Sequence, residues 1–346
     1  MSIIFYDGFD GYDDINDLLN YGGWVTQTNC TISSTVRIGT GKSLYINHFD
    51  QRFICYQFAT AQTDKTLYVG FAMRKISTPD SNREFFSLLK TASSHATQQI
   101  SIGVNKDNKL IMLRGSTVIG TGTATLANSV WYYIEAKMLV HGSTGKFEIY
   151  LNGVAEISEF TGNTMGQSTT DVEGFCLGSA STNTNVAAMV DDLYICNSET
   201  SINNTYLGEQ IIQILTPTSD SSVQWARNTG ASNYSAVDDP VGAPDDATTY
   251  LYDSTTGHKD EFGLSDLSGS VGAVNAVKVI TRAQKDDANA KSFKAGIKSG
   301  ATNQQVSHFL GIGYITFFDV FETSDGGSTA WTATTVNAAL STIEVI

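Results

Sequence analysis

Apolar and polar residues alternate with a period of two in short segments along most of the chain, and polar turn residues separate these segments. The clearest segments are residues 65–76, 98–115, 130–140, 145–157 and 187–197. Between 131 and 138, the residues Tyr132, Ile134, Ala136 and Met138 form the more apolar face, which we expect to point into a core. The pattern predicts β-strands with one buried face rather than helices.

Turn residues predict how some of these strands pair. Residues 106–109 (Lys-Asp-Asn-Lys) separate two alternating segments, and residues 152–153 (Asn-Gly) follow another. Both predict β-hairpins, because Asn and Gly tolerate the positive φ of a tight turn. One helix of about two turns is expected at 14–21, with Asp13 as its N-cap and Gly22 at its end.

The length of the chain favours two domains. Its 346 residues exceed what one hydrophobic core usually serves. After Asn197 the sequence becomes polar, then briefly apolar, and Pro217 breaks it, which predicts a linker and an entering strand at 199–218. We therefore expect a β-sandwich at 1–198 and a smaller β-sandwich at 219–346. The acidic stretch at 238–266 is interpreted as a solvated, turn-rich connection.

Composition argues against two classes of partner, nucleic acids and membranes. The net charge of −14 argues against nucleic acid, because phosphate binding needs clustered Lys and Arg. No run approaches the roughly 20 apolar residues of a membrane span, so no membrane insertion is expected. The first residues lack a basic segment followed by an apolar stretch, so we expect no secretion signal and synthesis in a cytosol.

The four cysteines are widely spaced and lie within apolar runs. They are Cys30, Cys55, Cys176 and Cys196. We interpret them as buried thiols, with a disulfide or a metal site as the alternatives.

Three segments resemble strands of the concanavalin A-like or laminin G-like jelly roll: 131–137 (WYYIEAK), 146–153 (KFEIYLNG) and 191–195 (DDLYI). This resemblance implies an all-β chain, in which a concanavalin A-like jelly-roll β-sandwich is followed by the second, smaller sandwich.

Other segments resemble structural proteins of tailed bacteriophages. The opening at 5–24 is similar to the start of such domains, and 206–225, 245–267, 279–300 and 320–345 are similar to their companion domain. The resemblance covers nearly the whole chain. It implies a virion protein that is synthesised in the host cytoplasm, contacts other virion proteins and forms a homo-oligomer.

Catalysis is not expected from the sequence. Glucan-cleaving enzymes with a jelly roll would require a set of carboxylates on one strand, such as Glu-x-Asp-x-x-Glu. The nearest pair, Glu156 and Glu159, flanks Ile157 without a third acid at strand spacing. We therefore expect no catalytic residues and no enzymatic activity.

Metal and cofactor chemistry is also not expected. The five histidines lack the short repeated spacing of zinc ligands, and a surface position is expected for each: His48, His95, His141, His258 and His308. Asp191 and Asp192 are adjacent on an expected strand, so we predict that one faces inward or caps a loop. Calcium binding at these strand ends is the alternative.

Basic residues alternate with apolar ones in two segments of the second domain. If residues 285–291 form a hairpin between them, Lys278, Arg282, Lys294 and Lys298 share one exposed face. Such a face could dock onto an acidic partner or a neighbouring subunit. The alternative is a solubility device that protects a sheet edge from pairing.

These observations lead to three functional hypotheses. The first is a non-enzymatic structural component of a tailed-bacteriophage virion, in the tail or its fibres or as a capsid decoration. The second is a glycan- or receptor-binding adhesin module that recognises a host surface glycan, and the third is a polysaccharide depolymerase. No residue can be named as a sugar ligand from the sequence.

Overall fold

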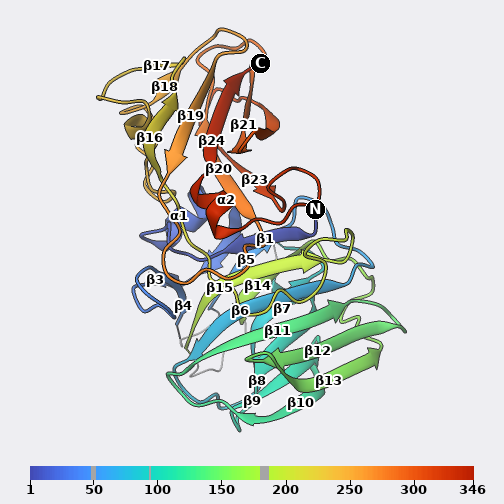
Figure 1. Ribbon diagram of the computed structural model, residues 1–346. Coiled ribbons are helices and arrows are strands. Elements are labelled where there is room, and N and C mark those ends of the chain that lie inside the picture. The colour runs from blue at the N-terminus through green and yellow to red at the C-terminus, as the bar shows by residue number, and fades with distance from the viewer. Residues whose placement is uncertain (48–51, 93–94, 180–186) are drawn as a thin grey trace. The chain divides into compact units, whose positions relative to one another are not determined.

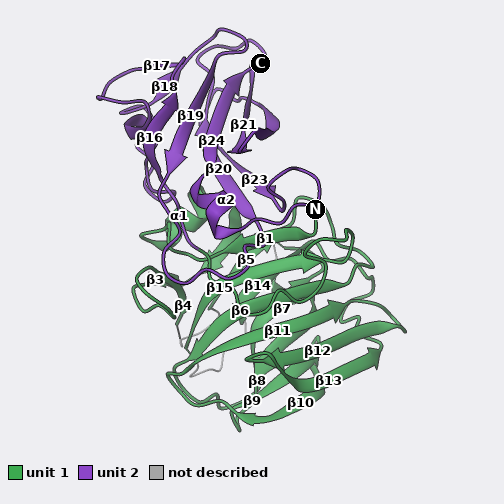
Figure 2. Cartoon of the chain, in the orientation of Figure 1, with its two compact units in different colours: residues 1–212 green, residues 213–346 purple. Residues whose placement is uncertain are grey.

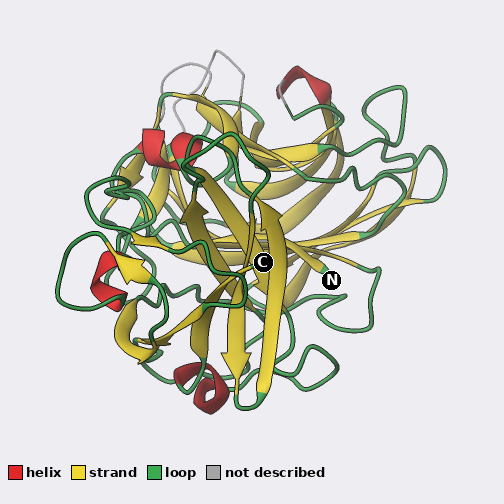
Figure 3. Ribbon diagram, turned by 90° about the horizontal axis from the view of Figure 1, so that it is seen from above, coloured by secondary structure: helices red, strands yellow, loops and turns green. Residues whose placement is uncertain are grey.

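The computed structural model describes residues 1–47, 52–92, 95–179 and 187–346 (Figure 1). The chain divides into two compact units, Met1–Ile212 and Gln213–Ile346 (Figure 2). Strands dominate both units and the helices are few and short (Figure 3). The prediction of an all-β fold is confirmed.

Unit 1 is a β-sandwich of two antiparallel sheets. The larger sheet has the order β13-β12-β11-β6-β15-β4-β3, and β1 also pairs with β15. Its strands are β1 (Ile3–Asp7), β3 (Cys30–Ser33), β4 (Ser43–Ile46), β6 (Leu67–Lys75), β11 (Trp131–Leu139), β12 (Gly145–Leu151), β13 (Val154–Gly162) and β15 (Ala188–Asn197).

The second sheet of unit 1 has the order β10-β9-β8-β7-β14-β5-β2. Its strands are β2 (Trp24–Thr28), β5 (Arg52–Gln57), β7 (Arg83–Leu89), β8 (Gln98–Val104), β9 (Lys109–Arg114), β10 (Thr117–Thr125) and β14 (Gly174–Ser179), and the short 3-10 helix η1 (His95–Thr97) precedes β8. Rings from both sheets meet in the core, where Phe86 of β7 stacks on Phe71 of β6 and on Phe175 of β14.

The predicted hairpins are confirmed. β8 pairs with β9 across residues 105–108, and β12 pairs with β13 across Asn152 and Gly153, which have φ angles of 50° and 77°. The predicted helix is present as α1 (Ile15–Asn20), but its N-cap is Asp14 and not Asp13. Asp14 forms a capping box with Asp17, a reciprocal pairing that decides between the two adjacent aspartates.

The predicted core face of β11 is largely confirmed, since Ile134, Ala136 and Met138 are fully buried, while Tyr132 is half-buried. The opposite face of this strand is also covered, because Glu135 is only 4% exposed. All ten residues of β15 are buried. A further layer must therefore lie on the outer face of the larger sheet.

That layer is the strap, which we define as residues 205–212. The Tyr206 ring packs against Tyr68 of β6 and Tyr150 of β12, with centroids 5.0 Å and 4.9 Å away. Its hydroxyl donates to Glu148 Oε1 at 2.8 Å. The strap thus binds side chains of two strands in the larger sheet.

Backbone groups of the strap satisfy buried polar groups of the sheet. The amide of Gly208 donates to Glu135 Oε1 at 2.9 Å, and the amide of Leu207 donates to the Tyr194 hydroxyl at 3.0 Å. Tyr194 in turn donates to Glu135 at 2.6 Å. The Tyr194 ring lies over Gly70, where a Cβ atom would come within 2.1 Å of it. The strap explains why a carboxylate can be buried on this face.

Unit 2 contains a five-stranded sheet of order β16-β19-β24-β21-β22 and two separate strand pairs. The strands are β16 (Pro217–Ser222), β17 (Ala226–Arg227), β18 (Leu251–Tyr252), β19 (Lys259–Leu264), β20 (Val277–Ala283), β21 (Ser292–Ser299), β22 (Thr302–Phe309), β23 (Ile315–Phe321) and β24 (Leu340–Val345), with the 3-10 helix η2 (Tyr234–Ala236) and the helix α2 (Ala333–Asn337). β17 pairs with β18, and β20 pairs with β23.

The core of unit 2 forms around Trp331, which is 2% exposed. It clusters with Ile297 of β21, Phe321 of β23 and Val336 of α2. The indole nitrogen donates to the Phe321 carbonyl at 2.8 Å, so this buried ring has its hydrogen-bond partner. Across the described residues of both units, no helix has the length and apolar character needed to cross a membrane.

Candidate functional site

A cavity of about 20 Å³ lies in unit 1 where four strands begin or end. Ile46 ends β4, Arg52 begins β5, Arg83 begins β7 and Ser179 ends β14. These ends meet because β14 pairs antiparallel with both β5 and β7, which sets Ser179 opposite Arg52. The other lining residues are Asn47, Glu84, Phe85 and Gly178. We call this cavity the strand-end pocket.

The two arginines of the strand-end pocket carry buried donors. Within the described residues, Nε and Nη1 of Arg52 and Nε of Arg83 have no hydrogen-bond partner. Arg83 is only 4% exposed, and its burial lowers the pKa of its guanidinium from the usual high value. A guanidinium nevertheless stays protonated in proteins. Buried charged donors without a partner are costly, so these nitrogens call for a water or a ligand oxygen.

The pocket lining has an excess of positive charge. Two arginines face one carboxylate, Glu84, whose Oε2 accepts from the Ser179 hydroxyl at 2.6 Å. The Nη2 atom of Arg83 donates to Ser81 at 3.1 Å and lies 3.6 Å from the half-exposed carboxylate of Asp80. The remaining charged and polar atoms of the arginines can therefore serve an anionic group.

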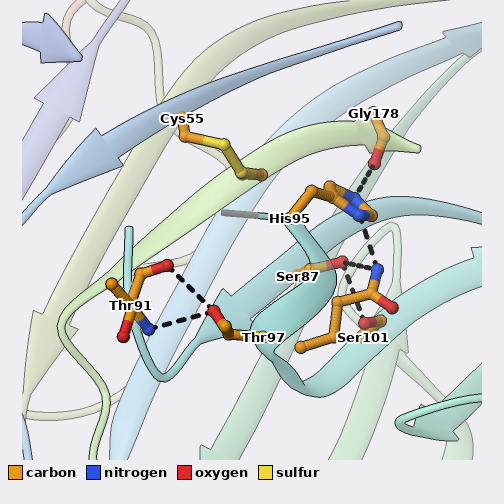
Figure 4. The surroundings of a disulfide bond; sticks show 9 residues. Cys55, Ser87, Thr91, His95, Thr97, Ser101 and Gly178 are labelled. Atoms are coloured by element: carbon orange, nitrogen blue, oxygen red, sulfur yellow. Dashed lines mark hydrogen bonds between the residues drawn. A yellow bond between two sulfur atoms is a disulfide. The ribbon is translucent and has the colours of Figure 1, made fainter. Parts of the chain in front are cut away.

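Gly178 holds the end of β14 against Arg52. Its φ is 98°, and a Cβ atom there would lie 2.2 Å from the Arg52 carbonyl oxygen, so only glycine fits. Its own carbonyl lies 3.2 Å from His95 Nε2 (Figure 4). Burial lowers the pKa of His95, which favours the neutral ring with Nε2–H as the donor.

His95 is buried, so the expectation of a surface position is wrong for this residue. Burial follows from its packing on Phe53, with ring centroids 5.2 Å apart. The nearby Ser87 and Ser101 hydroxyls bond each other at 2.9 Å (Figure 4), so neither is paired with His95 as an activated nucleophile. The contact between His95 and the Gly178 carbonyl therefore positions the end of β14. His48 lies outside the described residues.

The interpretation of all four cysteines as thiols is wrong for one pair. Cys55 of β5 and Cys176 of β14 face each other in register and form a disulfide (Figure 4). The pairing depends on two strands that are distant in sequence, so the apolar surroundings alone could not reveal it. Cys30 and Cys196 are buried thiols as expected, and burial raises the pKa of Cys30 to about 12.

Both Asp191 and Asp192 are buried, each at 5% exposure. Asp192 accepts from Nη2 and Nε of Arg37 at 2.7 Å and 3.0 Å, and from the Ile212 amide of the strap at 2.8 Å. Asp191 accepts from the Asp192 amide at 2.9 Å. The pair is buried together because Asp192 has a φ of 49° at a bulge of β15, which breaks the expected alternation.

Burial and the neighbouring carboxylate of Asp192 raise the pKa of Asp191 to about 8. In the described part of the chain, no three His, Cys, Asp or Glu side chains gather closely enough to hold a metal ion. The hydrogen bonds of these two aspartates go to an arginine and to backbone amides, which is a structural role.

The hairpin predicted at 285–291 does not form. β20 pairs with β23, whereas β21 pairs with β22 and β24, so the two basic segments belong to different sheets. On β20, Lys278 lies over the Phe318 ring at 5.7 Å, and Arg282 forms a two-nitrogen ion pair with Asp246. The prediction failed because strand partners were assigned by proximity in sequence.

The basic residues of β21 also have acidic partners. Lys294 lies 3.9 Å from Glu344 of β24, and Lys298 lies 2.7 Å from Glu261 of β19. The structure therefore places Lys278 and Arg282 on one sheet and these two lysines on another. A docking role for the four residues stays a prediction.

The two acids considered for catalysis are also engaged. Glu159 bridges Lys137 at 2.7 Å and Lys146 at 3.2 Å. Glu156 accepts from the Ala124 amide at 2.7 Å.

The sequence analysis did not identify Arg52, Arg83 or the strand-end pocket. The only signal in the sequence was a charged residue at the start of each of these two apolar strands.

The sequence matches no family model and no curated protein. Among solved structures, it is similar to the Trypanosoma rangeli sialidase (13% identity, 48% of this chain and 26% of that chain, TM-score 0.36). It is also similar to alginate lyase Aly36B (9%, 55% and 95%, 0.39) and to the lectin UEA-II complexed with galactose (11%, 57% and 99%, 0.39). The chain thus spans about a quarter of the length of the sialidase.

The class of unit 1, a β-sandwich, follows from its two antiparallel sheets, and these solved structures are similar to the chain in fold alone. They also correct one expectation from the sequence. The solved structures that the chain matches include a sialidase and an alginate lyase, so the missing glucanase acid set does not support the inference that the chain is not an enzyme. The missing glucanase acid set rules out only one way of placing carboxylates on this fold.

Proposed function

We propose that this chain is a host-recognition component of a tailed-bacteriophage virion and that unit 1 binds a surface glycan at the strand-end pocket. The buried, unpartnered donors of Arg52 and Arg83 carry this proposal. Ligand sites typically combine apolar walls with a few polar groups that converge on one point. Here Ile46 and Phe85, both 3% exposed, provide the apolar wall.

The setting on a virion has two supports. The sequence resembles phage structural proteins in its opening and in its second part. The Cys55–Cys176 disulfide adds a second support, because disulfides persist in oxidising surroundings such as a virion surface. A position in the tail, in a fibre or on the capsid is compatible with both.

A glycan array with the full chain tests the recognition role. We expect binding to a small set of bacterial surface glycans and no binding by the heat-unfolded chain. Binding to no glycan on a broad array would contradict the proposal. Reducing-sugar release from a bound glycan would identify the chain as a depolymerase as well as a binder.

Mass spectrometry of purified particles tests the virion setting. The chain should be present in a fixed ratio to the other structural proteins after the particles are banded in a density gradient. Its absence from particles, together with its presence in the lysate, would contradict the setting.

A further inference from the structure

The geometry points to a carboxylated saccharide as the ligand of the strand-end pocket, with its carboxylate held by Arg52 and Arg83. This inference rests on the proposed glycan binding and specifies its chemical class. Three nitrogens of these two residues are buried without a partner in the described part of the chain. Guanidinium groups match the planar carboxylate group especially well.

The charge of the lining favours an anion. Among the lining residues two arginines face one carboxylate, Glu84, and the half-exposed Asp80 lies 3.6 Å from Arg83 outside the lining. Ile46 and Phe85 give the cavity apolar walls, and surroundings of low polarity strengthen the attraction between a guanidinium and an oxyanion. A neutral sugar hydroxyl would satisfy one of the three buried donors, whereas a carboxylate can accept from more than one of them.

The cavity is large enough for only a small part of a ligand. A volume of about 20 Å³ holds little more than one water molecule. One oxygen-bearing end of a carboxylate can enter it, whereas a sugar ring cannot. The ring must therefore lie outside the cavity, which makes the anionic group the anchor and the saccharide the part that distinguishes a glycan from a free small acid.

Isothermal titration calorimetry of the full chain with three probes tests this inference. The probes are a galacturonate hexamer, a galactose hexamer of the same linkage, and sodium acetate. We expect the galacturonate hexamer to bind at least about tenfold more tightly than the neutral hexamer, and acetate to compete with it weakly.

Two variants with opposite expected effects on galacturonate binding make the test specific. Arg52→Lys keeps the charge but removes the planar donors and should weaken galacturonate binding at least about tenfold. Glu84→Gln removes the competing carboxylate and should strengthen it. Arg114→Gln is the control: Arg114 ends β9 and does not line the pocket, so galacturonate binding should be unchanged. The thermal midpoint of each variant checks that it is folded.

The outcomes separate this inference from the proposed function. Equal binding of both hexamers would overturn the carboxylate anchor and leave glycan binding by the chain intact; if Arg52→Lys also has no effect, the glycan binds outside the strand-end pocket. Binding of acetate alone would overturn the saccharide as ligand. A glycan array without any binding would contradict the proposed function itself.

Discussion

At the scale of single residues, the two adjacent buried aspartates of unit 1 differ in protonation: Asp192 carries a negative charge and Asp191 carries a proton. Arg37 contacts Asp192 with two nitrogens, so the negative charge is compensated there. Among the described residues only backbone amides donate to Asp191, and its raised pKa of about 8 leaves it protonated at neutral pH. Burial also raises the pKa of Asp10 to about 6, and Asp192 adds to this shift. The interior of unit 1 therefore binds protons that an unfolded chain would release.

This difference predicts how stability depends on pH. The folded pKa of Asp191 lies above the value of roughly 3.9 in an unfolded chain. The contribution of protonated Asp191 to the free energy of unfolding is therefore complete below about pH 4, and it is lost as the pH rises toward 8. Asp191→Asn should flatten the decline in unfolding free energy between pH 5 and 9 by at least about 1 kcal/mol.

Urea unfolding at pH 5, 7 and 9 measures this effect, with the exposed Asp107→Asn as control. Parallel pH profiles for Asp191→Asn and the unchanged chain would mean that Asp191 is already ionised at neutral pH.

At the scale of elements, short-range patterns were reliable and long-range contacts were not. The turns predicted at 106–109 and 152–153 form at 105–108 and 152–153, because their residue types tolerate positive φ locally. The strap was not predicted, because its residues 205–212 have no periodicity and depend on distant strands for their contacts. The same reason explains the missed disulfide and the wrong hairpin at 285–291. Each required knowledge of which strands are neighbours.

The strap should contribute measurably to the stability of unit 1. Tyr206→Ala removes two ring contacts and one hydrogen bond and should lower the free energy of unfolding by about 1–3 kcal/mol. Tyr206→Phe keeps the ring and should cost about 1 kcal/mol.

Tyr252→Ala is the matched control, since Tyr252 is 53% exposed and should change stability by less than about 0.5 kcal/mol. Denaturant unfolding followed by tryptophan fluorescence measures all three variants. Equal stability of Tyr206→Ala and Tyr252→Ala would show that the strap is not docked in solution.

The disulfide predicts a redox-dependent stability of unit 1. It joins β5 and β14 across a sequence separation of 121 residues. Replacing both Cys55 and Cys176 by serine should lower the free energy of unfolding by about 2–5 kcal/mol. Reductant should destabilise the unchanged chain to a similar extent and leave the double variant unaffected. If reductant leaves the free energy of unfolding of the unsubstituted chain unaltered, the disulfide is not formed in solution.

At the scale of the whole molecule, the candidate site arises from topology. Arg52, Arg83 and Ser179 are single residues without a shared motif, and only the antiparallel order β7-β14-β5 brings them together. The sequence could therefore predict the all-β class from its period of two, but not the pocket. The expectation of an inactive scaffold failed for a related reason, because it tested one arrangement of acids on a fold that supports several.

The most direct test of a glycan site at the strand-end pocket is a crystal structure of the chain soaked with a galacturonate hexamer. We expect density for a carboxylate within hydrogen-bonding distance of Arg52 and Arg83, with its sugar ring outside the cavity. A water molecule in the cavity and a saccharide bound elsewhere, or no saccharide at all, would contradict the account.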